Sequence, residues 1–477
     1  MLFNGKELKK EEYLSINSEF TKNGITVSVK GKKYNIEYPE EIWKQYPARN
    51  KKVLLDNIPF MQTCHLPASH KLKGAVYNTG MPLFETFAFE GTMYDAPSTA
   101  VIDHEKTVDY LRGFFNTEFS FGSYDIAYPR NRRKTKWIKN GRAAIIPFTA
   151  GKESLLTFAL CLELGIKPIL VYIDEDPDGP ESKHKYAIID SIEKEYGIKV
   201  YKVVNSSGKL RYCDLGEVEN NWGAGTQFLS YILLLMPFAR HFGAEHILFG
   251  NEYSCDEFNY DKEGFKSNFC YDQCTDWTKQ LNAVTKIMTK DSVEVGSLVG
   301  PLYELGLTKI LHQRYPHLAS LQMSCFSDTE PGKKHVWCGH CSKCARLFAF
   351  FKALGIDTSS LGFAVNMFNK PSREFFSLFG TGSNYSFDIS GLGKEEQALA
   401  FYLAAEHGET GYLVDKFKKT KAYREVRDNI EVLQMKYFSC HDSITLPEVF
   451  RKRVVHVFEQ TFRGDFWPKD FRVKQGR

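Results

Sequence analysis

Residues 143–164 read AAIIPFTAGKESLLTFALCLEL. The apolar run 143–148 predicts a buried strand, and the pattern of residues 154–164 predicts a helix. A short turn, residues 149–154, joins the two. The first backbone N–H groups of a helix have no partner within the helix, and its dipole adds about half a positive charge at that end. The stretch therefore predicts a site for a phosphate or pyrophosphate group.

The side chains of this turn fit that interpretation. Ala150 and Gly151 are small enough for a phosphate to approach the backbone, and Lys152 supplies a cation. The turn is not a Walker A loop, because that motif needs a glycine five residues before Gly151. The alternative is a strand-to-helix turn that binds nothing. The candidate nucleotide-binding residues of the turn are Thr149, Ala150, Gly151, Lys152, Glu153 and Ser154.

Strand and helix patterns alternate after this turn. Strands are expected at 168–173, 198–204 and 246–249, and helices at 184–196 and 228–242. This order predicts an α/β fold with a parallel sheet and helices on both faces. Ligands of such sheets lie beyond the carboxyl ends of the strands. Further nucleotide-binding candidates are Asp174, which ends the second strand, and Gly223 and Gly225, which precede the helix at 228.

The chain divides into three expected regions. Residues 1–135 predict a mixed, mostly β domain that begins with a hairpin, residues 25–38. Residues 143–350 form the phosphate-binding domain, and residues 351–477 a helical region with amphipathic helices at 395–406 and 446–461. The basic run Arg130–Arg142 between the first two is interpreted as a linker, with a nucleic-acid contact as the alternative.

Cysteine spacing is the second strong signal. Cys325, Cys338, Cys341 and Cys344 follow a C-x12-C-x2-C-x2-C pattern. Four thiolates at such spacing predict a closed, structural zinc site. An iron–sulfur cluster is the alternative metal centre, and His335 or His340 is an alternative ligand.

Composition sets the class of protein. The chain has 477 residues, 43% of them hydrophobic, with 62 Lys plus Arg against 58 Asp plus Glu. This near balance favours no particular acidic partner. The most apolar stretch, 228–239, is too short to span a membrane, and no secretory signal is visible. Eleven cysteines without an export signal favour reduced thiols. We therefore expect a cytoplasmic protein without a membrane partner, and the oligomeric state is not predicted.

The turn resembles the S-G-G-x-D-S loop of the PP-loop (N-type) ATP pyrophosphatases, with Ala150 in place of a glycine and Glu153 in place of the aspartate. Together with the cysteine set it is similar to the cyano-deazaguanine synthases of that superfamily. A closer resemblance, over residues 140–410, is to the ATP-dependent UDP-N-acetylmuramoyl-L-alanyl-L-glutamate epimerase family. It is carried by the runs Asn251-Glu252-Tyr253-Ser254-Cys255, Trp337-Cys338-Gly339-His340-Cys341-Ser342-Lys343-Cys344 and Gly391-Leu392-Gly393-Lys394-Glu395-Glu396.

This resemblance implies an adenine nucleotide alpha hydrolase-like fold with ATP, Mg²⁺ and Zn²⁺ as cofactors. It implies an enzyme that adenylates the carboxylate of a small molecule, releases pyrophosphate, and then epimerises a terminal glutamate. Lys152, Glu252 and Cys255 are the catalytic candidates, and Asp272 and Cys274 are further acid–base candidates. The alternatives are an amide- or nitrile-forming enzyme, a tRNA-modifying enzyme, and a nucleotide- and zinc-binding module without turnover.

Overall fold

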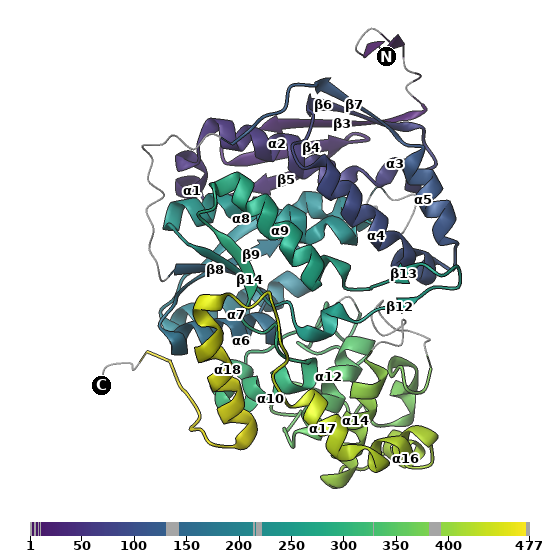
Figure 1. Ribbon diagram of the computed structural model, residues 1–477, viewed down its shortest axis with the longest axis vertical. Coiled ribbons are helices and arrows are strands. Elements are labelled where there is room, and N and C mark those ends of the chain that lie inside the picture. Colours follow the sequence, from purple (N-terminus) through teal and green to yellow (C-terminus); the bar gives the residue numbers. More distant parts are fainter. Residues whose placement is uncertain are drawn as a thin grey trace.

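The computed structural model describes residues 2–3, 6–7, 9, 11–129, 143–212, 215, 222–327, 329–380 and 393–473. Within this part of the chain, a ten-stranded, mostly parallel sheet flanked by helices forms the centre of the molecule (Figure 1). The predicted α/β class is confirmed. The basic run Arg130–Arg142 and the pair Gly391-Leu392 lie outside the described residues.

Five adjacent strands form the parallel half of the sheet, in the order β14-β11-β8-β9-β10. Side chains of β8 alternate between two cores, because successive residues of a strand point to opposite faces. Ile145 packs with α8 and α9, whereas Ile146 packs with α6 and α7. The predicted helices on both faces are therefore present. The elements are β8 (Ala143–Pro147), α6 (Lys152–Leu164), β9 (Lys167–Asp174), α7 (Pro180–Tyr196), β10 (Val200–Asn205), α8 (Gln227–Phe242), β11 (His246–Phe249), α9 (Thr275–Thr289) and β14 (Glu294–Ser297).

The amino-terminal strands continue the same sheet. β5 (Lys32–Glu37) pairs antiparallel with β10, so the order runs on as β5-β4-β3-β6-β7. In Figure 1 these strands lie at the top of the view and adjoin the teal strands of the parallel half. The predicted hairpin is present as β4 (Gly24–Val29) and β5. Its two-residue turn places Lys30 at φ 49° and Gly31 at φ 80°, as a type I′ turn requires. The remaining strands are β3 (Tyr13–Phe20), β6 (Gly74–Gly80) and β7 (Glu118–Ser123).

The amino-terminal region is mixed α+β, as expected, but the narrower expectation that it is mostly β was wrong. It contains the long helices α2 (Ala48–Thr63) and α4 (Glu85–Asp103), together with α5 (Thr107–Phe115). Every residue of α2 from Val53 to Thr63 is buried. A helix that is buried on all sides has no polar face and shows no amphipathic period in the sequence. Shorter elements here are β1 (Leu2–Phe3), β2 (Lys6–Glu7), α1 (Glu40–Gln45) and α3 (Leu66–Ser69).

The carboxyl-terminal region is helical, as predicted. α18 (Glu448–Arg463) packs into the core shared by α6 and α7, through Val454 and Phe458. α12 and α14 belong to a third core, which contains the four cysteines. These helices lie at the bottom of Figure 1. Their bounds are α10 (Glu304–Arg314), α11 (Pro316–Ala319), α12 (Ser342–Ala353), α14 (Lys394–Glu406), α15 (Tyr412–Phe417), α16 (Lys421–Asp428) and α17 (Ile430–Tyr437).

Short connections complete the chain between these elements. They are the 3₁₀ turns η1 (Ser206–Tyr212), η2 (Ala224–Thr226), η3 (Tyr253–Asp256), η4 (Tyr271–Gln273) and η5 (Lys370–Phe375), and the strand pair β12 (Asn259–Tyr260) and β13 (Lys266–Ser267). Among the described residues, every helix falls short of the length and apolar character needed to cross a bilayer.

Candidate functional site

The turn after β8 lies at the carboxyl edge of the parallel strands and opens directly into α6. Gly151 is the N-cap of α6, and the Thr149 side chain is exposed above it. The Ser154 hydroxyl donates to the Gly151 carbonyl over 3.1 Å, which closes the first turn of the helix. A Cβ on Gly151 would lie 3.1 Å from Glu153 Oε2 and 3.3 Å from Thr149 Oγ1. Position 151 therefore leaves little room for a side chain, and the Gly151 N–H donates to Thr149 Oγ1 over 3.4 Å.

Ala150 adopts a left-handed backbone conformation, with φ 55°. This conformation costs an L-residue with a Cβ about 1–2 kcal/mol, and glycine adopts it freely. Ala150 is buried, and its carbonyl accepts a hydrogen bond from the Met323 N–H over 2.9 Å. The surrounding structure thus holds an alanine in a conformation that glycine adopts more readily.

Lys152 lies buried within a group of acidic side chains. Its ammonium is 2.8 Å from Glu304 Oε1 and contacts Glu153 Oε1. Burial lowers the pKa of Lys152, but the carboxylates of Glu153, Glu304 and Glu252 outweigh burial and raise it above its usual value. Lys152 is therefore a permanent cation at the start of α6.

Glu304 was not predicted from the sequence. Burial raises its pKa, but Arg346 and Lys152 outweigh that effect, and the net shift is downward. Arg346 Nε lies 3.1 Å from Glu304 Oε2. Glu304 begins α10, just after the short strand β14, and neither element was predicted. Recognising β14 as a further parallel strand, with a charged residue at the start of the helix after it, could have identified Glu304 from the sequence.

Three carboxylates of this group could hold a metal ion. One oxygen from each of Glu153, Glu252 and Glu304 lies within 4.8 Å of the others. Gly250 permits the approach, because a Cβ there would lie 2.4 Å from the Cβ of Glu153. Carboxylate oxygens are the ligands that Mg²⁺ prefers.

Glu252 differs from its neighbours in protonation. Burial raises its pKa to about 8, with Lys152 opposing the shift and Glu304 and Glu153 adding to it. Glu252 therefore carries a proton at neutral pH, as a carboxylic acid beside two carboxylates. In acid–base chemistry, the protonated Glu252 is therefore a proton donor rather than a base.

This raised pKa predicts a pH dependence of stability. A carboxyl group whose pKa is higher in the folded state stabilises the protein below its unfolded value, and the contribution is lost as pH rises through the folded value. We expect the free energy of unfolding to fall between about pH 5 and about pH 8 through this group. Glu252→Gln should flatten that slope in urea unfolding, whereas Glu431→Gln, at an exposed position on α17, should leave it unchanged. Equal slopes for wild type and Glu252→Gln would contradict the assignment.

The other predicted nucleotide contacts are engaged by the protein itself. Asp174 accepts a hydrogen bond from Ser182 Oγ over 2.7 Å and another from the Tyr186 hydroxyl, both on α7. The Gly223 N–H donates to the Arg211 carbonyl over 3.2 Å, and the Gly225 N–H donates to Asp95 Oδ2 over 3.1 Å.

The predicted acid–base candidates beyond Glu252 are buried. The Cys255 thiol hydrogen-bonds with Cys270, which together with burial raises the pKa of Cys255 well above its usual value. Burial raises the pKa of Asp272 to about 7, against the opposing charge of Arg211. Cys274 caps α9, and its sulfur accepts a hydrogen bond from the Trp277 N–H over 3.4 Å.

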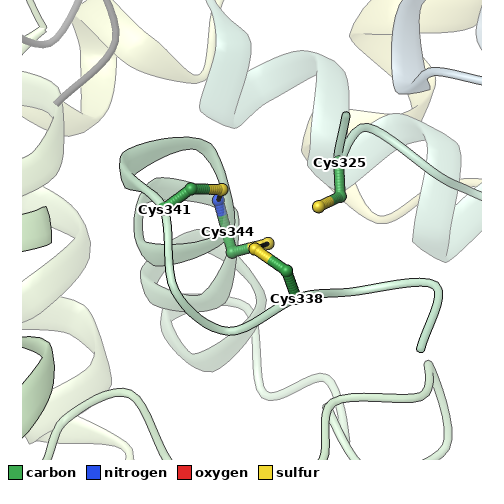
Figure 2. Close-up of side chains that lie close together, drawn as sticks. All are labelled: Cys325, Cys338, Cys341 and Cys344. Atoms are coloured by element: carbon green, nitrogen blue, oxygen red, sulfur yellow. Dashed lines mark hydrogen bonds between the residues drawn. The ribbon is translucent and has the colours of Figure 1, made fainter. Parts of the chain in front are cut away.

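The four cysteines of the predicted metal site meet. Their sulfurs all lie within 4.8 Å of one another, and the sulfurs of Cys338 and Cys344 are 3.7 Å apart. Figure 2 shows Cys325 approaching from a separate segment and facing the other three. In the part of the chain that the structure describes, this group contains sulfur ligands alone, without His335 or His340. Four buried thiolates could hold a metal such as zinc.

Backbone N–H groups support these sulfurs. The N–H of His340 donates to Cys338 Sγ over 3.3 Å, and that of Ser327 donates to Cys325 Sγ over 3.3 Å. The N–H of Cys344 donates to Cys341 Sγ over 3.4 Å. Such bonds stabilise negative charge on the sulfurs and orient them towards a shared ion.

The four-cysteine group lies at the start of a helix that brings further cations close to residues 149–154. Cys341 caps α12, and Lys343 and Arg346 lie in the first turns of that helix. Arg346 reaches Glu304 as described above, and the charges of Lys343 and Lys152 lie close enough to influence each other. Cations from α6 and α12 thus converge beside the same carboxylates.

Comparison with protein-family models, curated proteins and solved structures finds no match. The interpretation of this site therefore depends on its geometry and on the sequence resemblance described above.

Proposed function

We propose that this protein binds ATP with its triphosphate at residues 149–154 and transfers AMP to the carboxylate of a small molecule, releasing pyrophosphate. The observation that carries the proposal is the strand–turn–helix at the carboxyl edge of the parallel sheet, with a buried cation, Lys152, at its helix start. Its position matches the edge at which α/β sheets bind ligands.

The charges at this site suit pyrophosphate as a leaving group. Lys152 and Arg346 are both paired with Glu304 in the structure. Phosphate oxygens of a bound nucleotide would offer these cations new partners, and the freed carboxylate would join Glu153 as a ligand for Mg²⁺. Glu252 would become the third ligand after releasing its proton to solvent. Mg²⁺, when bound, would neutralise the charge that develops on the departing pyrophosphate. The residues present therefore fit both the nucleotide and its metal.

The remaining roles follow from position and protonation. The N–H groups at the start of α6 would orient the phosphates, and Lys152 would stabilise charge in the transition state. Epimerisation of the adenylated product needs one base and one acid. Glu252 and Cys255 are both protonated at neutral pH, so one of them would first have to lose its proton. We therefore propose adenylation as the core activity, and epimerisation stays a prediction.

Product analysis tests this function. The purified full chain is incubated with Mg-ATP and a panel of carboxylates, including UDP-N-acetylmuramoyl-L-alanyl-L-glutamate, and the nucleotide products are separated by chromatography. We expect AMP and pyrophosphate in equal amounts with one class of carboxylate, and none without Mg²⁺. Formation of ADP and phosphate, or the absence of ATP binding, would contradict the proposal. A change in stereochemistry of the recovered substrate would extend it to epimerisation.

A further inference from the structure

A buried lysine bridges the phosphate-binding turn and the segment that leads to the cysteine site. Lys185, on α7, donates one hydrogen bond to the Met323 carbonyl over 2.7 Å and another to the Thr149 carbonyl. The Met323 N–H donates to the Ala150 carbonyl over 2.9 Å. Residues 149–150 are thus held against Met323 by two connections, one direct and one through Lys185.

Burying a cation at this position is energetically unfavourable. Lys185 is 3% exposed, and its nearest carboxylate, on Glu181, lies 4.0 Å away. Burial lowers the pKa of Lys185 to about 8, with Glu181 opposing the shift. A buried charge is tolerated where hydrogen bonds replace its hydration, and two backbone carbonyls do so here. An apolar side chain could fill the same volume but could not join the two segments.

Met323 is also two residues from a metal ligand. Cys325 closes the four-sulfur group from a separate segment, as Figure 2 shows. Ser324 alone lies between them, and Met323 and Cys325 are both fully buried. An ion bound to Cys325 therefore restrains the backbone that Lys185 and Ala150 contact.

We propose that Lys185 is a positioning residue that couples metal binding at the four cysteines to phosphate binding at residues 149–154. The inference rests on the proposed function, because it requires that the turn bind phosphate groups. Coupling between two sites is reciprocal, so phosphate binding must strengthen metal retention by the same factor by which the metal strengthens phosphate binding.

The test uses zinc and inorganic pyrophosphate as probes on the full chain. Zinc affinity is measured by competition with a colorimetric chelator, with and without saturating pyrophosphate, and each value is corrected for the zinc that pyrophosphate itself binds in a protein-free titration. Pyrophosphate affinity is measured by calorimetry. We expect pyrophosphate to tighten zinc binding by about 5- to 100-fold in the wild type. In Lys185→Met the ratio should fall close to one while one zinc per chain is retained. Lys183→Met, at an exposed position on the same helix, should keep the wild-type ratio.

The outcomes separate the two proposals. A wild type that binds pyrophosphate with a zinc-affinity ratio of one overturns the coupling and leaves the proposed function standing. A wild type that binds no pyrophosphate overturns both. An unchanged ratio in Lys185→Met overturns the role of Lys185. If Lys185→Met does not fold, Lys185→Arg replaces it, because arginine keeps a cation and its hydrogen-bond donors. A folded Lys185→Arg that binds both zinc and pyrophosphate but shows no coupling would also contradict the role of the cation.

Discussion

Replacing Lys152 with methionine should lower the rate of AMP formation by about 100- to 1,000-fold, the range for losing one charged stabiliser of a transition state. Lys152 Nζ lies 2.8 Å from Glu304 at the start of α6, and we propose that it contacts the phosphates. The rate is measured as pyrophosphate release at saturating ATP. Lys167→Met is the matched control, because Lys167 is exposed at the start of β9, the opposite end of the parallel strands.

A second variant tests whether lost stability alone explains the lost rate. Removing the Lys152 ammonium leaves Glu304 buried without one of its partners, which is destabilising in itself. The double variant Lys152→Met/Glu304→Gln removes that unpaired charge. We expect it to recover part of the lost unfolding free energy but none of the lost rate. Recovery of the rate along with stability would show that Lys152 acts on the fold alone.

Cys341→Ser should prevent the four-cysteine group from binding a metal, and should unfold the region around α12 and α14. Structural zinc contributes an apparent 10–16 kcal/mol in small zinc-binding peptides, so the loss of one ligand is expected to be large. The four cysteines belong to the core that α12 and α14 share, and Cys341 caps α12. Metal content by mass spectrometry, the thermal midpoint and limited proteolysis give the measurement.

The control for this variant is Cys440→Ser. Cys440 is half-buried and lies outside the four-sulfur group. We expect it to retain the metal and nearly all of the wild-type thermal stability. Equal metal content in wild type and Cys341→Ser would contradict the site. Metal analysis of the wild type also distinguishes zinc from iron, because an iron–sulfur centre would colour the protein.

The alternation of strand and helix between residues 143 and 249 predicted four of the five strands in the parallel half of the sheet, all but β14. Its elements agree with the structure to within a few residues, because the apolar strands and the helices of this region are separated by polar turns. The meeting of the four cysteines also followed from the sequence, since Cys338, Cys341 and Cys344 are close along the chain. Both predictions depended on residues that are close to one another in the sequence.

The contacts that complete the site could not be predicted in this way. Glu304, Arg346 and Lys185 come from three helices outside the turn at residues 149–154, and each is an ordinary charged residue in its own segment. Their meeting depends on how α7, α10 and α12 pack against the sheet. Similarly, the α2 helix was missed because complete burial removed its polar face.

The antiparallel pairing of β5 with β10 has a consequence for how the chain folds. It brings together residues as distant as Asn35 and Ser206, which hydrogen-bond although 171 residues separate them. Contacts of such long range close slowly, because the entropy of the intervening loop is lost before the contact forms. Protein synthesis proceeds at about 5–20 residues per second, so β10 is synthesised on the order of ten seconds or more after the β4–β5 hairpin. During that time the open edge of the nascent hairpin is a natural target for chaperones.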